Sequence, residues 1–166
     1  MARKRGAIRL PSRQIAAQSP AGLYMGRSRG GLTTKIDALV DGFGRPIRLM
    51  LTAGQAYDGH AALDMLTALP AGARLLADRA YDSNAIRTLI GVQGATAVIP
   101  SMPRRTPKIA HDRCAYESRN LVERFFNKLK HFRAVATRYD KRDDSFLASV
   151  QLASIRIWLR SYEPVS

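Results

Sequence analysis

The chain has 166 residues, 46% of them hydrophobic, and its 27 Lys and Arg against 13 Asp and Glu give a formal net charge of +14. This length and composition predict one folded domain rather than a disordered chain, and no apolar run approaches the roughly 20 residues that cross a bilayer. The single cysteine excludes an internal disulfide. We therefore expect a cytoplasmic protein with no membrane contact, whose positive charge suits a polyanion and above all nucleic acid.

The N-terminal residues are basic and lack a folding pattern. The first 35 residues carry eight Lys or Arg side chains and no acidic one. Up to Gly31 they show neither helical nor strand periodicity, and prolines and glycines interrupt them. We interpret residues 1–31 as a basic flexible arm and residues 163–166 as a tail. A chain end without a role is the alternative for the arm.

Strand patterns begin after the arm. A strand over Thr33–Val40, a turn at Asp41–Gly44 and a returning strand over Pro46–Thr52 predict a β-hairpin. Asp58 can cap a helix that runs to about Leu69, where Pro70 stops it. Two short apolar runs, typical of buried strands, follow with a helix between them. They are Arg74–Asp78 and Thr96–Pro100, and the helix is capped by Asp82 or Ser83 and ended by Gly91 or Gly94.

The last third of the sequence is predicted to be helical. Prolines and basic side chains between Ser101 and Asp112 favour an exposed basic loop. One helix is expected from Cys114 to about Phe132, with Leu121, Phe125 and Leu129 toward the core, and another from about Asp143 to Ser161. Because strands and helices alternate after the hairpin, the predicted fold class is α/β with a mixed sheet.

Asp78 and Glu123 stand out by position. Asp78 ends an apolar strand and precedes a turn and a helix, which is where α/β sheets bind ligands; a carboxylate that only caps the turn is the alternative. Glu123 shares one stripe of the helix that begins near Cys114 with Tyr116, Arg119 and Lys130. Such a stripe suits a hard cation and phosphates together, although a solvated face with charge pairs is the alternative.

These residues carry a resemblance to a known family. The spacing of Tyr116, Arg119, Glu123 and Lys130 is similar to the Y-R-E-K signature of insertion-sequence transposases of the DDE class. Further blocks resemble the family in the same order along the chain. They are Gly26–Ile36, Leu39–Asp41, Leu51–Asp58 and Ala77–Ser83. The resemblance runs from about Gly26 to Trp158 and is closest to the five-type members of the insertion-sequence four/five group.

The resemblance implies a ribonuclease-H-like mixed sheet flanked by helices, over residues 32–162. It implies a transposase that cleaves DNA strands at transposon ends and transfers them to target DNA. Three carboxylates of such a site hold two Mg²⁺ (or Mn²⁺) ions, and the resemblance makes Asp78 and Glu123 two of these catalytic, metal-binding residues. Duplex DNA is the implied partner, both transposon ends and target, and we expect a homodimer on it.

The first catalytic Asp of the family has no counterpart here. The sequence holds no Asp or Glu before Asp37, which is mid-strand, and Asp41 lies in the hairpin turn. Asp37 is the better substitute, since strand alternation can turn it toward the active face. We therefore expect an N-terminally incomplete copy that binds DNA but cuts it poorly or not at all, because two carboxylates must balance four positive charges.

Two basic regions are expected to hold DNA phosphates. Between Pro103 and Arg142 there are 12 Lys and Arg against four acidic residues, and the N-terminal arm adds more. No base-reading helix pair is evident. The predicted DNA-binding residues are Tyr116, Arg119, Lys130, Arg104, Arg105, Lys108, Arg27 and Arg29. There are two rival interpretations. One is a non-catalytic DNA-binding remnant or regulator. The other is a basic RNA-binding protein, but an RNA-binding role does not account for Asp78 or for the Y-R-E-K spacing.

Overall fold

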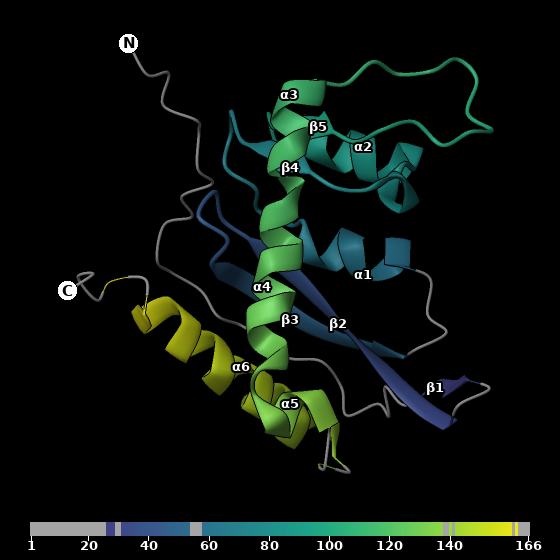
Figure 1. The fold of residues 1–166 in the computed structure, drawn as a ribbon. Coiled ribbons are helices and arrows are strands. Elements are labelled where there is room, and N and C mark those ends of the chain that lie inside the picture. Colours follow the sequence, from purple (N-terminus) through teal and green to yellow (C-terminus); the bar gives the residue numbers. More distant parts are fainter. Residues whose placement is uncertain are drawn as a thin grey trace. The chain divides into compact units, whose positions relative to one another are not determined.

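The computed structural model describes residues 26–28, 31–53, 58–137, 140, 142–160 and 162, and every structural statement below concerns these residues. The chain forms two compact units. Asp41–Phe43 and the described residues from 58 to Leu121 belong to the first unit, and the remaining described residues belong to the second. Figure 1 labels the elements of both units.

The second unit contains an antiparallel sheet in the order β1-β2-β3. Its strands are β1 (Gly26–Ser28), β2 (Gly31–Val40) and β3 (Pro46–Ala53). The predicted hairpin is confirmed, with Ile36 opposite Leu51 and a register irregularity between Leu39 and Val40. Gly44, in the turn that joins the strands, has a φ of 78°, which favours glycine.

The end of the predicted arm is part of this sheet. Gly26–Ser28 forms β1 and pairs with Gly31–Thr33, so these residues are a strand and not an irregular segment. Residues 1–25 and 29–30 lie outside the described part of the chain, and so does the predicted tail at 163–166. The domain boundaries at residues 32 and 162 stay predictions.

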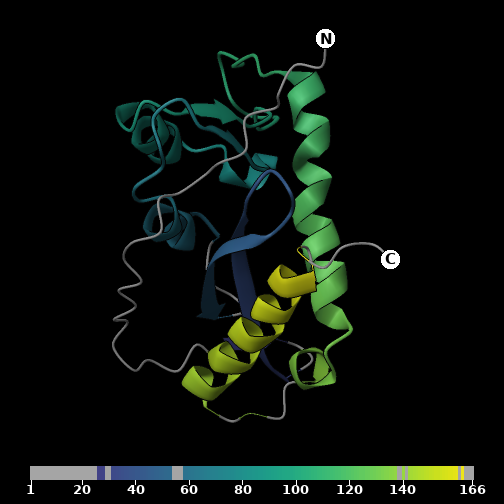
Figure 2. The ribbon, with the colours of Figure 1, turned by 90° about the vertical axis from the view of Figure 1, so that its left-hand side faces the viewer.

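Helices α4 (Asn120–Lys130), α5 (Arg133–Thr137) and α6 (Asp143–Arg160) complete the second unit. Alternate residues of β2, at Ile36, Ala38 and Val40, face one core with them, as the two-residue period of a strand requires. In Figure 2, α6 lies along the hairpin. The buried members of this core are Leu51, Phe125, Leu129, Val135, Phe146, Val150, Ala153 and Ile157.

The first unit is built around a parallel pair of strands. Its elements are α1 (Asp58–Met65), β4 (Arg74–Leu76), the 3-10 turn η1 (Arg79–Tyr81), α2 (Asn84–Val92), β5 (Thr96–Val98), α3 (Arg113–Tyr116) and the 3-10 turn η2 (Glu117–Arg119). β4 and β5 pair in parallel, with Leu75 opposite Ala97, and α2 is the crossover helix between them. Ser83, one of the two predicted caps, accepts a hydrogen bond from the Ile86 amide at the start of α2.

The predicted α/β class is confirmed, and the described strands pair as one antiparallel and one parallel sheet. That they belong to a single ribonuclease-H-like mixed sheet stays a prediction. The end of one helix was predicted wrongly, and another helix was missed. The helix predicted to end at Leu69 ends at Met65, because Ala68 takes a positive φ of 62° and Pro70 disfavours a helical Leu69. Helix α5 was not expected at all, since five residues are too few for a periodic pattern.

The helix predicted from Cys114 to Phe132 is three consecutive pieces, α3, η2 and α4. The backbone stays in the right-handed helical region at Tyr116 and Asn120, on either side of η2. A 3-10 helix has about 3.0 residues per turn instead of about 3.6, so three residues rotate the face by roughly 60° more than an α-helix would. The straight stripe predicted across this segment is therefore not kept.

Among the helices of the described residues, none combines the length and the apolar character that a membrane span requires.

The final helix matches its prediction closely, since α6 covers Asp143–Arg160. The basic loop expected at Ser101–Asp112 is present as an irregular segment between β5 and α3 (Figure 1).

Candidate active site and nucleic-acid interface

Asp78 lies at the carboxyl end of β4. The Ala77 amide extends the pairing with β5 by donating to the Val98 carbonyl at 3.4 Å. Asp78 follows in an extended conformation and caps η1, its Oδ1 accepting a hydrogen bond from the Ala80 amide at 2.9 Å. The carboxylate is half-buried. It therefore occupies the strand end where ligands bind in parallel sheets, and it also caps the turn, as the alternative interpretation held.

Asp82, at the far end of η1, is the centre of a buried ion cluster. Its side chain is 0% exposed. Oδ1 accepts a hydrogen bond from Arg87 Nε at 2.7 Å, and Oδ2 accepts from Arg105 Nε and the Met102 amide, both at 2.7 Å. Arg87 and Arg105 are themselves only 13% and 17% exposed. One carboxylate thus joins the end of η1, helix α2 and the basic loop.

The charge state of Asp82 follows from these contacts. Burial raises the pKa of the carboxyl, but the hydrogen bonds from the Met102 amide and from the two arginines outweigh it, so the pKa lies below its ordinary value. Asp82 is therefore ionised at neutral pH. Both arginines make a further hydrogen bond: Arg87 donates to the Ile99 carbonyl at 2.8 Å, and Arg105 donates to Asn84 Oδ1 at 2.8 Å.

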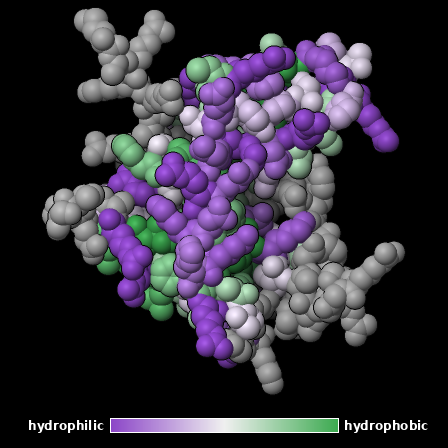
Figure 3. Space-filling model, in the orientation of Figure 1, coloured by the Kyte–Doolittle hydropathy of each residue, from purple (hydrophilic) through white to green (hydrophobic). Residues whose placement is uncertain are grey.

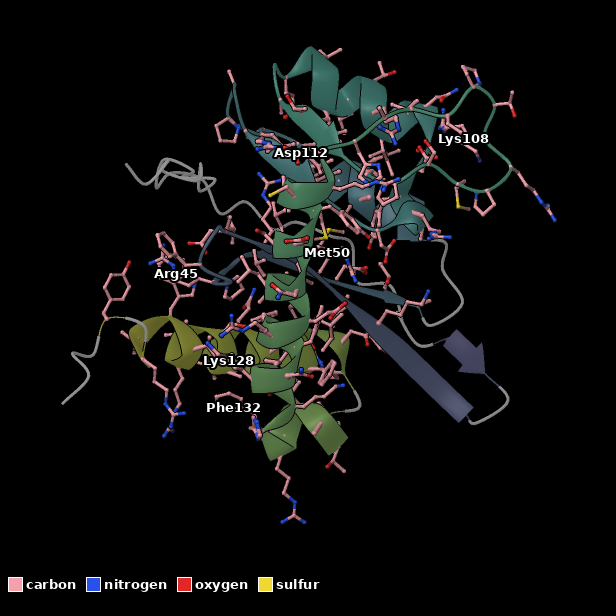
Figure 4. The ribbon with its side chains drawn as sticks, turned by 45° about the horizontal axis from the view of Figure 1, so that its top comes forward. Arg45, Met50, Lys108, Asp112, Lys128 and Phe132 are labelled. Atoms are coloured by element: carbon pink, nitrogen blue, oxygen red, sulfur yellow. The ribbon has the colours of Figure 1, made fainter. Side chains whose placement is uncertain are left out.

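The loop Ser101–Asp112 is closed by its own hydrogen bonds. Ser101 Oγ accepts from the Ile109 amide at 2.8 Å and donates to the Ile109 carbonyl at 3.1 Å. Lys108 Nζ donates to the carbonyls of Met102 and Pro103. Figure 4 shows Lys108 within this loop. The exposed basic loop predicted from sequence is confirmed as exposed, and its hydrogen bonds give it a defined shape.

The predicted DNA-binding residues of this loop have different environments. Arg104 is exposed. Arg105 is bound to Asp82 and Asn84, and Lys108 is exposed but bound to loop carbonyls. A hollow of about 410 Å³ lies beside the loop, and Lys108, His111 and Arg113 are among the residues that line it. Its basic lining can accept an anionic group such as a phosphate.

Asp112 fixes the start of α3 after the loop (Figure 4). Its Oδ1 accepts from the Ala115 amide at 2.9 Å, and Oδ2 forms an ion pair with Arg74 of β4 at 2.5 Å. Both interactions lower the pKa of Asp112, and the hydrogen bond from the Ala115 amide contributes more than the one from Arg74. Both side chains are nearly half exposed, at 44% and 47%, so the ion pair is screened by water.

Tyr116 and Arg119 meet at the junction of α3 and η2. The Arg119 guanidinium carbon lies 5.6 Å from the centre of the Tyr116 ring, within the range of a cation–π contact. His111 packs edge-on against the same ring at 5.6 Å. Arg119 and Tyr116 are half-buried. The predicted pair of phosphate-binding residues is therefore brought together within the first unit.

Glu123 and Lys130 are both exposed on α4. Phe125 and Leu129 of the same helix are 1% and 2% exposed and face the core, so the division between a polar and an apolar face is as predicted. Figure 3 shows hydrophilic side chains along the outward surface of α4. Glu123 has an interaction within the chain. Its exposed carboxylate carries the kind of oxygen ligand that a hard divalent cation prefers.

The predicted acidic residues divide between the two units. Asp78 belongs to the first unit and Glu123 to the second, and that their carboxylates converge stays a prediction. Asp37, the possible substitute for the first ligand, is half-buried on β2 and accepts a hydrogen bond from Thr52 Oγ1 at 2.7 Å. Asp41 is buried in the hairpin turn and accepts from the Phe43 amide, which makes it a turn residue.

No group of three His, Cys, Asp or Glu that could hold a metal ion is present among the residues that the structure describes. The side chains of Arg27 and Arg29 lie outside that part of the chain.

Sequence reasoning missed the role of Asp82, which it took only as a possible helix cap. No local pattern could have revealed it, because Arg105 lies 23 residues away along the chain.

Comparison with known proteins identifies the family. A family model described as a transposase DDE domain matches residues 8–158, most of the chain. The chain therefore belongs to the transposase DDE-domain family, whose members act on DNA by phosphoryl transfer and generally use divalent metal ions.

A relative links the chain to an insertion sequence. A curated protein of Brucella ovis, named as a transposase for insertion sequence element IS6501, is 38% identical over 130 residues, which are 78% of this chain and 100% of that protein. The resemblance to an insertion-sequence DDE transposase is thus confirmed. No solved structure matches the chain.

Proposed function

We propose that residues 32–162 form a ribonuclease-H-like catalytic domain of a transposase of the insertion-sequence four/five group, in which Asp78 and Glu123 are two of the metal-binding carboxylates. The observation that carries the proposal is the position of Asp78 directly after a strand of a parallel pair, in a chain that belongs to the DDE family. Glu123, exposed on the helix that bears the Y-R-E-K spacing, supports the second assignment.

The donor chemistry fits a hard divalent cation. Carboxylate oxygens are the ligands that Mg²⁺ and Mn²⁺ prefer, and the Asp78 cap uses only one of its two oxygens. Two such ions, when bound, activate the attacking oxygen and stabilise the leaving oxygen of an in-line displacement. Asp78 and Glu123 would hold them, and the family's third carboxylate has no counterpart upstream of Asp37 in this sequence.

The basic residues of both units have the chemistry to hold the DNA backbone. Arg119, oriented by Tyr116, can grip a phosphate through its guanidinium fork, and Lys130 adds a point charge on α4. Arg104 and Lys108 of the loop extend the phosphate contacts, while Arg105 acts first as the partner of Asp82. These contacts orient duplex DNA, both transposon ends and target, and we propose that a homodimer binds it.

The test is Mg²⁺-dependent nicking of a supercoiled plasmid carrying the element's ends, measured beside DNA binding by fluorescence anisotropy. We expect binding in the absence of metal, with weak nicking that Asp78→Asn and Glu123→Gln both abolish while leaving binding intact. Glu117→Gln, an exposed acid in η2, is the matched control and should retain the residual nicking. Nicking that survives both active-site substitutions would overturn the assignment of the two carboxylates.

A second candidate function is a non-catalytic DNA-binding remnant or regulator of the parent element. The exposed cations Arg104 and Lys130 support it, because they can hold DNA phosphates whether or not a metal site is present. This candidate predicts DNA binding with no nicking at any Mg²⁺ or Mn²⁺ concentration. Strong nicking that Glu123→Gln abolishes would instead show that the site is complete and would exclude the remnant.

A further inference from the structure

Helix α6 is apolar on two faces. One face supplies Phe146, Val150, Ala153 and Ile157 to the core of the second unit. On the opposite side large apolar side chains stay exposed: Leu152 by 67%, Ile155 by 53%, Leu159 by 61%, and Tyr162 just beyond the helix by 66%. A single exposed leucine needs no explanation, but a continuous row of them on one helix face is typical of an interaction surface.

This row has the spacing of a coiled-coil seam. It begins with two small exposed residues, and its six positions are separated by three, four, three, four and three residues. They are Ser145, Ala148, Leu152, Ile155, Leu159 and Tyr162, which we call the α6 seam. Alternating steps of three and four place the first five on one side of α6, with Tyr162 just beyond its end, and allow a second helix to pack against them.

The seam is held rigidly at its C-terminal end. Trp158 Nε1 donates to the Pro46 carbonyl at 2.7 Å, and the Arg45 guanidinium lies 4.4 Å from the centre of the Trp158 ring. Arg45 also donates to the Tyr162 hydroxyl at 3.0 Å. Figure 4 shows Arg45 near the end of α6. Because the hairpin fixes this end, binding of a partner orders few additional side chains.

The order of side chains along the seam fits a second copy running in the opposite direction. A two-fold axis between Leu152 and Ile155 places these two residues across from each other. It also sets the large Leu159 against the small Ala148, and the large Tyr162 against Ser145. Two large side chains thus meet at the axis, and a large one meets a small one at each level on either side of it, which allows close helix packing. A parallel copy would instead place small against small at one end and large against large at the other.

Charge favours the same direction. The first turn of α6 carries Asp143 and Asp144, the last turn carries Arg160, and Arg142, just before the helix, forms an ion pair with Asp144. In the antiparallel arrangement the negative end of each helix dipole lies beside the positive end of the other, and Arg160 lies toward the N-terminal half of the second copy. In a parallel arrangement the like ends of the two helix dipoles would meet.

We propose that two copies of this chain associate through an antiparallel pairing of the α6 seam. This inference rests on the proposed function, because it assigns a surface to the homodimer proposed there. Six seam positions are few compared with the roughly 20–30 residues per side of a standard interface, and two chains of net charge +14 repel each other. DNA neutralises that charge, so the pairing is strongest on DNA.

The direction and register are tested by disulfide trapping. In a Cys114→Ser background, which removes the chain's single cysteine, protein with Ala148→Cys is mixed with protein carrying Leu159→Cys, with and without duplex DNA. Mild oxidation should give a disulfide-linked heterodimer of the two variants, more of it with DNA. Each variant alone should give at least about fivefold less dimer. Efficient trapping of Ala148→Cys with itself would overturn the antiparallel pairing.

The surface itself is tested by sedimentation velocity of the full chain bound to a short duplex. Ile155→Glu should raise the dissociation constant of the dimer by about tenfold or more, since it buries a charge in the seam. Val92→Glu changes an equally apolar residue of α2 that is 80% exposed and should leave the dimer intact. Circular dichroism confirms that both variants fold.

The outcomes separate this inference from the proposed function. A dimer that tolerates Ile155→Glu overturns the α6 seam as the interface and leaves the transposase proposal standing. A wild-type chain that stays monomeric on DNA at every concentration overturns both the seam and the homodimer. A chain that does not bind DNA contradicts the proposed function, whereas trapping without DNA would still support the seam.

Discussion

Asp82 is a residue whose buried charge connects segments that are distant in sequence. Its carboxylate holds Arg87 of α2 together with Arg105 and the Met102 amide of the loop. Removing one member of a buried ion pair leaves the other charge without compensation, which costs about 3–5 kcal/mol. The loop shape near Asp78 therefore depends on a group that takes no direct part in the proposed chemistry.

Asp82→Asn should lower the free energy of unfolding by about 3 kcal/mol, at the lower end of that range because both arginines keep some contact with water. Urea denaturation measures this, and faster tryptic cleavage at Arg104 would report the released loop independently. Asp144→Asn is the control. It breaks an exposed ion pair with Arg142, 63% and 79% exposed, and should change the urea midpoint little. Equal effects of both substitutions would contradict the buried-cluster account.

The lowered pKa of Asp82 makes stability depend on pH with a definite sign. A carboxyl whose pKa is lower in the folded state stabilises above its unfolded pKa, and this stabilisation is lost as the pH falls through the folded pKa. Below about pH 4, the free energy of unfolding of the wild type should therefore fall faster with decreasing pH than that of Asp82→Asn, by up to about 1.4 kcal/mol per pH unit. Urea titrations at constant ionic strength measure the difference, and parallel pH curves would exclude it.

At the scale of one residue, sequence reasoning located Asp78 correctly at the end of a strand, because an acid after an apolar run is a local signal. The sequence could not show that Arg104 and Arg105 have different environments. The two are adjacent and chemically identical, and only the tertiary contact with Asp82 distinguishes the exposed side chain from the bound one.

Among the elements, the end of α1 shows how a side chain from another helix completes a terminus. Gln93, which follows α2, donates to the carbonyls of Leu66 and Leu89 at 2.9 and 3.0 Å. Its Oε1 accepts from the Leu69 amide at 2.5 Å. Leu66 and Leu69 are buried, so water cannot replace these bonds easily.

Gln93→Ala should therefore lower the free energy of unfolding by about 1–3 kcal/mol, because it leaves a buried carbonyl and a buried amide without partners. Gln151→Ala, at an exposed position of α6, is the matched control and should be close to neutral. Thermal or urea unfolding followed by circular dichroism measures both. If Gln93→Ala left the free energy of unfolding unchanged, water would be replacing the hydrogen bonds of Gln93 to the Leu66 carbonyl and the Leu69 amide.

The elements with strong local signals were predicted well. The hairpin, α2 and α6 each combine a periodic pattern with a turn or cap residue, and their observed bounds lie close to the predicted ones. The 3-10 turn η2 was not predicted, since no proline or glycine marks Glu117–Arg119. Which strands pair with which could not be derived from the sequence pattern, because pairing depends on contacts between distant segments, which periodicity does not encode.

For the whole molecule, the net charge of +14 makes DNA binding depend on salt, and the number of phosphate contacts sets how strongly. Each phosphate contact releases counterions and adds about 0.9 to the slope of log affinity against log salt concentration. The net charge alone, however, does not show which Lys and Arg side chains contact the DNA backbone. The hydrogen bonds of the loop make that distinction, because a guanidinium that already binds Asp82 has fewer donors to offer a phosphate.

Arg104→Gln should therefore reduce the salt slope by about one unit, measured by anisotropy on a short duplex between 50 and 200 mM salt, a range chosen because the slope is steep there. Arg105→Gln should change the slope less and instead lower stability, because its guanidinium holds Asp82. Arg156→Gln, an exposed cation of α6 outside the predicted DNA contacts, is the control. If Arg105→Gln lowered the slope as much as Arg104→Gln without loss of stability, Arg105 would leave Asp82 to bind DNA, and the loop would change shape on binding.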